Sequence, residues 1–142
     1  MTIDQISVFV ENKPGKLAEV VEALASENID MRALSIVDTS SFGILRLIVN
    51  KPALAQKVLR DAGCLVTVNE VIPVAVSDTP GGLALVLRVL SEHGIGVEYA
   101  YAFVAHKQGQ AYVVLRVEDN DFAIKTLEEH GIKLLTAEEM YA

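Results

Sequence analysis

The sequence contains little cysteine and little positive charge, and both shortages limit what the protein can do. Cys64 is the single cysteine among 142 residues, so no disulfide can form within the chain. Its neighbours Leu65 and Val66 favour a small buried core residue over a reactive thiol. The 12 Lys and Arg residues are scattered and are outnumbered by 19 Asp and Glu residues. This distribution argues against binding to nucleic acid or to an anionic membrane surface.

Targeting and membrane-spanning segments are also missing from the sequence. The first ten residues, MTIDQISVFV, carry Asp4 and no basic leader ahead of an apolar core, so they do not resemble a signal peptide. No apolar run approaches the roughly 20 residues that a transmembrane helix needs. We therefore expect a soluble, cytoplasmic protein.

Catalytic and metal-binding patterns are absent too. The sequence has no nucleophile elbow, P-loop or dinucleotide-binding fingerprint, and no histidine has companions at the spacing of a zinc site. His93 and His130 each precede a glycine at a predicted helix end, which is typical of a helix cap, and His106 lies alone in a predicted hairpin. The acidic stretch VEDND at 117–121 lacks the spacing of a calcium loop and is expected to begin a helix. We expect no enzyme activity, no metal and no cofactor.

The most informative feature that is present is a short motif that occurs twice. Residues 11–17 read ENKPGKL and residues 77–83 read SDTPGGL. Further on, LRDAG at 59–63 corresponds to LEEHG at 127–131. The apolar residues after each Pro-Gly pair also match: Leu17, Ala18, Val20, Leu24 and Ile29 correspond to Leu83, Ala84, Val86, Leu90 and Ile95. Such an ordered series indicates an internal duplication.

Both copies show the same succession of periodicities. Apolar residues alternate before each Pro-Gly pair, as in a strand, and follow helical spacing after it. The first copy predicts a strand at 5–10, a helix from Pro14, strands at 31–38 and 43–50 joined through TSSFG, a helix at 52–62 and a strand at 64–71. The second copy predicts a strand at 72–77, a helix at 80–93, strands at 96–106 and 109–118, a helix at 121–130 and a strand at 132–138. The order in each copy is βαββαβ.

This order of elements predicts the fold class. A βαββαβ unit typically forms a four-stranded antiparallel sheet with both helices on one face, the ferredoxin-like arrangement. With 51% hydrophobic residues the chain can bury a substantial core. We predict an α+β protein of two ferredoxin-like units in tandem, at residues 1–71 and 72–142. The segment between the copies, VNEVIPV, contains no Gly/Ser-rich spacer, so we expect the two units to be docked rigidly.

The ordered motifs resemble those of a known regulatory module. ENKPGKLAEV followed by ENIDM, and SDTPGGLALV followed by HGIGV, are similar to the ACT domain, a ferredoxin-like module that binds amino acids and regulates metabolic enzymes. The resemblance covers nearly the whole chain as two consecutive modules. It implies a free-standing tandem ACT protein that senses an α-amino acid. On binding, such a protein is expected to change its association with itself, as a homodimer, or with a metabolic enzyme.

The two Pro-Gly loops are the predicted ligand sites. Each lies where a strand ends and a helix begins, so backbone N–H groups and the positive end of a helix dipole converge on a spot that suits a carboxylate. A side-chain oxygen of Asn12 or Asp78 could accept a bond from a ligand ammonium. The resemblance implies a ligand at an interface between modules, held by this loop and by the start of the second strand. Matched by motif, the site residues are Asn12, Pro14, Gly15, Lys16, Leu17, Asn28 and Ile29 in the first copy and Asp78, Pro80, Gly81, Gly82, Leu83, Gly94 and Ile95 in the second.

The two loops differ, and a purely structural explanation of them stays open. Asn12 with Lys16 makes a neutral-to-basic corner, whereas Asp78 with Gly82 makes a more acidic and more open one. If one loop holds a ligand carboxylate, charge favours the first. Asn and Asp ahead of a helix are also common N-caps, and Pro-Gly is ordinary turn chemistry.

Apolar residues that point away from the predicted cores indicate an interface. Leu85 and Val89 make the first helix of the second copy apolar nearly all round. A face assignment that puts Leu34 and Ile36 on the helix side leaves four aromatic residues of the second copy on the opposite side of the sheet: Tyr99, Tyr101, Phe103 and Tyr112. We hypothesise that this face packs against another sheet, of the first copy or of a second chain. A shift of one residue would instead place the aromatic residues in an ordinary core. An alternative function is therefore an adaptor subunit that binds no ligand and acts through this surface.

Overall fold

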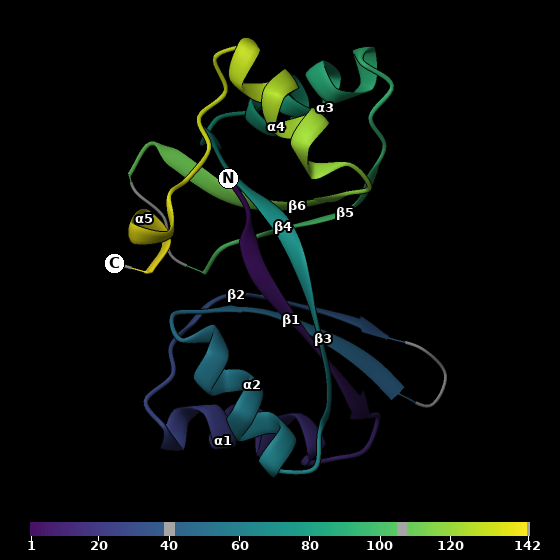
Figure 1. The fold of residues 1–142 in the computed structure, drawn as a ribbon, viewed down its shortest axis with the longest axis vertical. Coiled ribbons are helices and arrows are strands. Elements are labelled where there is room, and N and C mark those ends of the chain that lie inside the picture. Colours follow the sequence, from purple (N-terminus) through teal and green to yellow (C-terminus); the bar gives the residue numbers. More distant parts are fainter. Residues whose placement is uncertain (39–41, 105–107, 142) are drawn as a thin grey trace. The chain divides into compact units, whose positions relative to one another are not determined.

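The computed structural model describes residues 1–38, 42–104 and 108–141 (Figure 1). The chain divides into two compact units: a first unit of Asp4–Asn69, and a second unit of Met1–Ile3 with Glu70–Ala142. Residues 39–41 of the TSSFG stretch and His106 lie outside the described residues. In the described part of the chain, no helix has the length and apolar character that crossing a membrane requires.

The first unit is a sheet with two helices on one of its faces (Figure 1). Its strands lie in the order β2-β3-β1-β4, and β3 pairs antiparallel with both β1 and β2. The order of elements is the predicted βαββαβ. Its elements are β1 (Ile3–Glu11), α1 (Lys16–Ser26), β2 (Met31–Asp38), β3 (Phe42–Val49), α2 (Pro52–Asp61) and the start of β4 (Leu65–Ser77).

The second unit repeats this arrangement with the remainder of β4 as its first strand. Strand β6 lies between β4 and β5 and is antiparallel to both. The predicted strands 64–71 and 72–77 are therefore one continuous strand that belongs to both units. The further elements are α3 (Gly82–Glu92), β5 (Val97–Ala102), β6 (Gln110–Val117), α4 (Asn120–Glu129) and α5 (Ala137–Tyr141).

The C-terminal segment differs from the predicted strand at 132–138. Strand-like pairing is limited to a single antiparallel bridge between Leu134 and Val74. The chain then turns into α5, because Thr136 and Glu139 form a capping box: the Thr136 N–H donates to the Glu139 carboxylate, and the Glu139 N–H donates to Thr136 Oγ1, each at 3.1 Å. This local helix start ends the strand early.

Each unit has a hydrophobic core of its own, between its helices and one face of its sheet. In the first unit, Leu24 of α1 and Leu59 of α2 pack with the inward side chains of β1 and β3. In the second, Leu90 of α3 and Leu127 of α4 occupy the corresponding places. Val89 also lies buried in this second core, so its predicted position on the outer side of the helix is wrong. Leu85, in contrast, is 63% exposed.

Strand register decides which face the aromatic residues occupy. Ile36 lies opposite the core residue Leu45, so the predicted helix-side position of Leu34 and Ile36 is confirmed. In the second unit Ala102 takes that place, opposite the core residue Val113, while Tyr101 pairs with Val114 on the other face. The aromatic residues therefore lie on the sheet face that the helices do not cover, and the alternative of a one-residue shift is excluded. We call this face the aromatic surface: Tyr99, Tyr101, Phe103 and Tyr112.

Candidate functional site

The two Pro-Gly loops share one backbone geometry. Gly15 and Gly81 adopt positive φ angles of 85° and 89° and stand at the N-cap positions of α1 and α3. A glycine has no side chain that could accept a bond from the first-turn N–H groups of its helix. Asn12 and Asp78 lie three residues ahead of the caps, so the capping explanation of these two side chains is wrong. Pro14 and Pro80 belong to the turn that precedes each helix.

A cavity of about 220 Å³ opens beside the first Pro-Gly loop. It lies between this loop and the adjoining ends of β2 and β3. Its wall is partly apolar and partly charged, as is common in small-molecule sites. We call it the Asn12 cavity; its lining residues are Val10, Glu11, Asn12, Lys13, Leu17, Ile36, Asp38, Gly43 and Leu45.

The polar rim of the Asn12 cavity is held by short contacts. The Asn12 amide Nδ2 donates to Asp38 Oδ1 at 3.2 Å, which joins the Pro-Gly loop to the end of β2. Lys13 Nζ lies 3.0 Å from Glu11 Oε2. The hydrogen bond from Lys13, followed by its charge and that of Lys16, lowers the pKa of Glu11. The rim therefore holds one lysine, an ionised glutamate and the carboxylate of Asp38.

The structure brings some of the predicted site residues of the first unit together and separates others. Asn12 and Leu17 both line the cavity. Asn28 and Ile29 lie beyond the other end of α1, an 11-residue helix about 16 Å long, and they cannot reach the same cavity within the unit. Asn28 has a positive φ of 56° and ends the helix, as predicted, and Ile29 is buried in the core. Lys16 lies 3.7 Å from Glu19, which offsets the predicted basic character of this corner.

The second Pro-Gly loop is built differently at Gly82. A Cβ at Gly82 would overlap the backbone carbonyl of Ser77, whereas a Cβ at Gly81 would meet nothing within 4 Å. The missing side chain at Gly82 therefore lets the helix start approach the end of β4, and the predicted room for a ligand at this position is wrong. Leu83 follows on α3 and is 37% exposed, and the N–H of Asp78 donates to Gly109.

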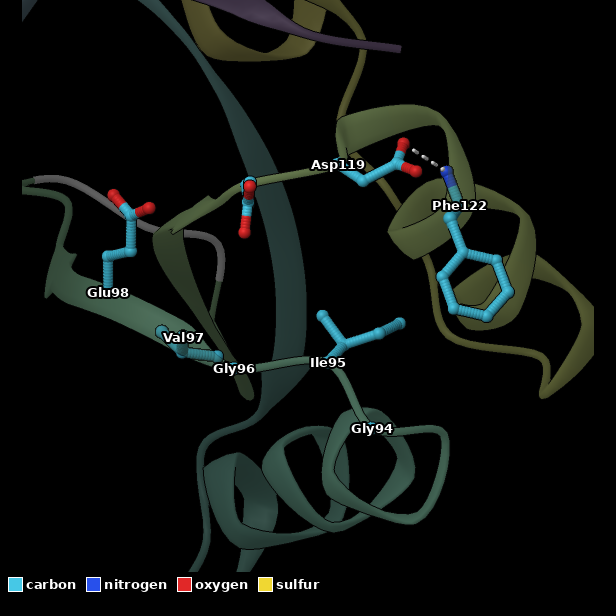
Figure 2. Close-up of a pocket in the computed structure, with 8 residues that line it drawn as sticks. Gly94, Ile95, Gly96, Val97, Glu98, Asp119 and Phe122 are labelled. Carbon is cyan, nitrogen blue, oxygen red and sulfur yellow. Dashed lines mark hydrogen bonds between the residues drawn. The ribbon is translucent and has the colours of Figure 1, made fainter.

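Gly94 and Ile95, beyond the far end of α3, line a different cavity of about 550 Å³ (Figure 2). Figure 2 shows the side chains of Glu98, Asp119 and Phe122 around it. Asp119 caps α4 by accepting a bond from the Phe122 N–H at 3.1 Å, and Glu98 lies 3.7 Å from Arg116. Together with Glu118 the wall carries three carboxylates. Such a wall repels a ligand carboxylate, so this cavity does not offer the predicted amino-acid site by itself.

The other titratable groups that the sequence singled out have structural places. His93 and His130 are the C-caps of α3 and α4, as predicted, and each ring donates from Nδ1 to a carbonyl four residues earlier at 2.8 Å. Their rings contact each other edge to face, with centroids 4.9 Å apart. Cys64 is partly buried against the first core, and this burial, followed by the charge of Glu19, raises the pKa of its thiol. Among the described residues, no group of three or more potential ligands could hold a metal.

Comparison with known proteins identifies the family. The family model described as the ACT domain pair matches residues 1–141. The chain belongs to the ACT domain pair family. The predicted resemblance to tandem ACT modules is thereby confirmed, and so is the predicted class of two ferredoxin-like α+β units. The search of curated proteins found no match.

Solved structures agree with membership of the ACT domain pair family. Protein BT0572 from Bacteroides thetaiotaomicron is 41% identical, over 99% of this chain and 96% of that chain, with a TM-score of 0.93. The regulatory subunit of aspartate kinase from Thermus thermophilus, in its ligand-free form, is 19% identical over 89% of this chain and 91% of that chain, with a TM-score of 0.64. The corresponding subunit from Thermus flavus is 18% identical, over 89% and 90% of the two chains, with a TM-score of 0.61. At these two identities the likeness concerns the fold.

Sequence reasoning missed the residues that come to the Asn12 cavity from the sheet. Ile36, Asp38 and Gly43 lie on β2 and β3, far from the Pro-Gly motif in the sequence, and reach it only through strand pairing. The pairing of Asp38 with Gly43 lies in the β2–β3 hairpin and could have been inferred from its register, whereas the pairing of Val10 with Gly43 joins strands that are not consecutive. The bond between Asn12 and Asp38 had no signal in the sequence.

Proposed function

We propose that this ACT domain pair is a regulatory protein that binds an α-amino acid in the Asn12 cavity. The observation that carries the proposal is the cavity itself, which places charges of both signs beside an apolar wall at the first Pro-Gly loop. An α-amino acid at neutral pH carries an ammonium, a carboxylate and a side chain, and each needs a different surface. We further propose that the protein is not an enzyme and that it acts in the cytoplasm.

The charges of the rim suit the two ends of the amino acid. Asp38 is proposed to accept from the ligand ammonium, because Asn12 already holds its carboxylate in place at 3.2 Å. The ligand carboxylate is proposed to bind Lys13 and the N–H groups at the start of α1, where the helix dipole is positive and the cap is a glycine. Ligand binding would then join α1, β2 and β3 at one corner of the first unit.

Substitution at the two equivalent loop positions tests the location of the site. Asn12→Ala is expected to weaken amino-acid binding by about fivefold, the effect of one lost hydrogen bond. Asp78→Ala, at the equivalent place in the second loop, is the matched control and should leave the affinity unchanged. Binding is found by thermal-shift measurement over the proteinogenic amino acids at millimolar concentration, because a ligand of the folded state raises the unfolding temperature. Affinities are then measured by isothermal titration calorimetry.

Three results of these measurements would contradict the proposal. If no amino acid raises the unfolding temperature, the sensor function is wrong and the adaptor function gains support. If binding survives Asn12→Ala unchanged, the site is not the Asn12 cavity. If Asp78→Ala alone abolishes binding, the ligand belongs to the second loop.

The regulatory output is proposed to be a change of association, with a second copy of the chain or with a metabolic enzyme. The aromatic surface, on the sheet face away from the helices, is the proposed contact of a homodimer. Tyr99 and Tyr101 stack with centroids 6.4 Å apart, and Phe103 meets Tyr112 at 6.0 Å. The three tyrosines are half-buried and Phe103 is buried, so the tyrosines are the part of this surface that a second copy would cover.

Charge placed on the aromatic surface is expected to separate the dimer. Tyr101→Lys should reduce the mass in solution from that of a dimer to that of a monomer, since an unpaired charge buried in an apolar interface is strongly unfavourable. Sedimentation equilibrium measures the mass. Ala84→Lys adds the same charge at an exposed position on α3 and is the control. A wild-type monomer, or a dimer that Tyr101→Lys leaves intact, would refute this interface.

A further inference from the structure

The Asn12 cavity contains an apolar wall whose residues come from four elements. Leu17 lies in the first turn of α1, Ile36 lies near the end of β2, and Val10 lies near the end of β1. Leu45 of β3 forms the buried floor between them. Leu17 is 39% exposed and Ile36 is 49% exposed, although both lie on the core side of their unit. An apolar ligand side chain that covered them would remove this area from water.

The equivalent corner of the second unit lacks part of this wall: Leu83 stands in the place of Leu17, but no large side chain stands in the place of Ile36. Ile36 lies opposite Leu45, and the residue in the same register position of the second unit is Ala102, opposite Val113. Val10 pairs with Gly43, whereas the equivalent Val76 pairs with Ala111, whose Cβ occupies the space that Gly43 leaves. The apolar pocket is therefore a property of the first unit and is not imposed by the fold.

The charges of the rim also differ between the two units. The equivalents of Glu11 and Lys13 in the second loop are Ser77 and Thr79, whose hydroxyls bond to each other at 2.9 Å. Two residues beyond Ala102 stands Val104, where the first unit has Asp38 two residues beyond Ile36. The second corner consequently has no lysine in the place of Lys13, and its loop carboxylate, Asp78, stands where the first loop has Asn12.

We propose that the Asn12 cavity selects an amino acid with a branched aliphatic side chain, and that each chain holds one such ligand. This inference rests on the proposed function and specifies the ligand class. The ligand's apolar side chain lies against Leu17 and Ile36, and its ammonium lies against Asp38. The volume of about 220 Å³ is below the 300–1,000 Å³ of drug-sized sites, which suits a molecule of this size.

The same rim disfavours charged ligand side chains. An acidic side chain would bring a second carboxylate beside Glu11 and Asp38, which repel it. A lysine side chain would need a second anionic partner besides the one that binds its α-ammonium. Glu11 already accepts from Lys13 at 3.0 Å, so Asp38 is the rim carboxylate left for an ammonium. One available carboxylate and an apolar wall match a neutral, aliphatic side chain.

Calorimetric titration of the full chain with a graded set of ligands tests the inference. The set is L-valine, L-isoleucine, L-leucine, L-alanine, L-aspartate, L-lysine and 3-methylbutanoate. Each buried methylene is expected to raise the affinity by roughly fourfold, so valine, with two more carbons, should bind about fifteenfold more tightly than alanine. 3-Methylbutanoate is valine without its ammonium and should bind at least tenfold more weakly than L-valine. The expected stoichiometry is one ligand per chain.

A pair of neighbouring substitutions on β2 locates the side-chain pocket. Ile36→Ala copies the second unit and should lower the affinity for valine by about tenfold, while leaving the weak affinity for alanine nearly unchanged. Val37→Ala is the control, because Val37 is 40% exposed on the same strand but points to the opposite face, across from Ile44. It should leave both affinities unchanged. Circular dichroism confirms that both variants are folded.

The possible outcomes separate this inference from the proposed function. Tightest binding of aspartate or lysine would overturn the ligand class while the amino-acid sensor stands. Valine binding that Ile36→Ala and Val37→Ala affect equally would overturn the placement of the side chain. Two ligands per chain of equal affinity would overturn the assignment to the first unit alone. If none of the seven ligands binds but another amino acid raises the unfolding temperature, the proposed ligand class is wrong and the amino-acid sensor stands. If no amino acid gives a thermal shift, both the ligand class and the sensor function are wrong.

Discussion

Replacing Leu90 by alanine is expected to lower the free energy of unfolding by about 2–5 kcal/mol. Leu90 lies on α3, and its side chain is completely buried in the core of the second unit. Truncation removes its apolar contacts and leaves a cavity that a close-packed surrounding fills only in part. Chemical denaturation followed by circular dichroism should show a lower midpoint with an unchanged slope, since the surface exposed on unfolding stays nearly the same.

Leu85→Ala provides the matched control, because it is the same substitution on the same helix. The Leu85 side chain is 63% exposed, so the change in unfolding free energy should stay within about 0.5 kcal/mol. No loss at Leu90 would contradict the core assignment. A loss at Leu85 as large as that at Leu90 would contradict its exposed position in the single chain and would show that a partner covers it.

The repeated motif made the fold predictable, because local and long-range signals agree in both copies. Pro52 stands at the first turn of α2, and Asn28, Gly63 and Gly94 end helices with positive φ angles, as their positions in the pattern predict. The alternation of apolar residues in the strands fixed which face meets the helices. That alternation alone was therefore enough to place the aromatic residues on the sheet face away from the helices.

The hydrophobic periodicity did not predict two parts of the fold correctly, the C-terminal segment and the burial of Val89. The apolar residues of 132–138 suit a strand, but the reciprocal bonds of Thr136 and Glu139 start a helix within that range. Val89 lies on α3 one turn after Leu85, but Val89 is buried in the second core whereas Leu85 is exposed. Helix orientation is a tertiary property, and the hydrophobic pattern of one helix does not contain it.

The candidate site was predictable as a loop but not as a cavity. Asn12 and Leu17 were found because the Pro-Gly motif contains them. Asp38 and Ile36 were not, because their place beside the loop depends on the register of β2 on β3 and of β3 on β1. Asn28 and Ile29 match the family pattern, yet the length of α1 separates them from the loop within one unit. The sequence motif therefore located the loop, whereas the pairing of the strands determines where a cavity forms beside it.

Replacing Gly82 by alanine is expected to destabilise the protein by about 1–3 kcal/mol, as overpacking of a close contact does. The added Cβ would overlap the carbonyl oxygen of Ser77, which is backbone and cannot turn aside like a flexible side chain. Either the end of β4 or the first turn of α3 must move. The effect is steric, since Gly82 does not have a positive φ angle. Thermal and chemical unfolding of the variant measure the loss.

Gly96→Ala is the control for Gly82→Ala within the same unit. A Cβ at Gly96 would meet nothing within 4 Å, and its φ angle is not positive. The substitution should be neutral, or stabilise by about 0.4–1 kcal/mol by restricting the unfolded chain. Equal stability of Gly82→Ala and the wild type would show that the second Pro-Gly loop is open after all, and would restore it as a ligand site equal to the first. A loss of stability in Gly82→Ala but not in Gly96→Ala means that the second glycine of the Gly-Gly pair in SDTPGGL is needed for the close contact between β4 and α3. The Asn12 cavity is then the loop site that has room for an amino acid.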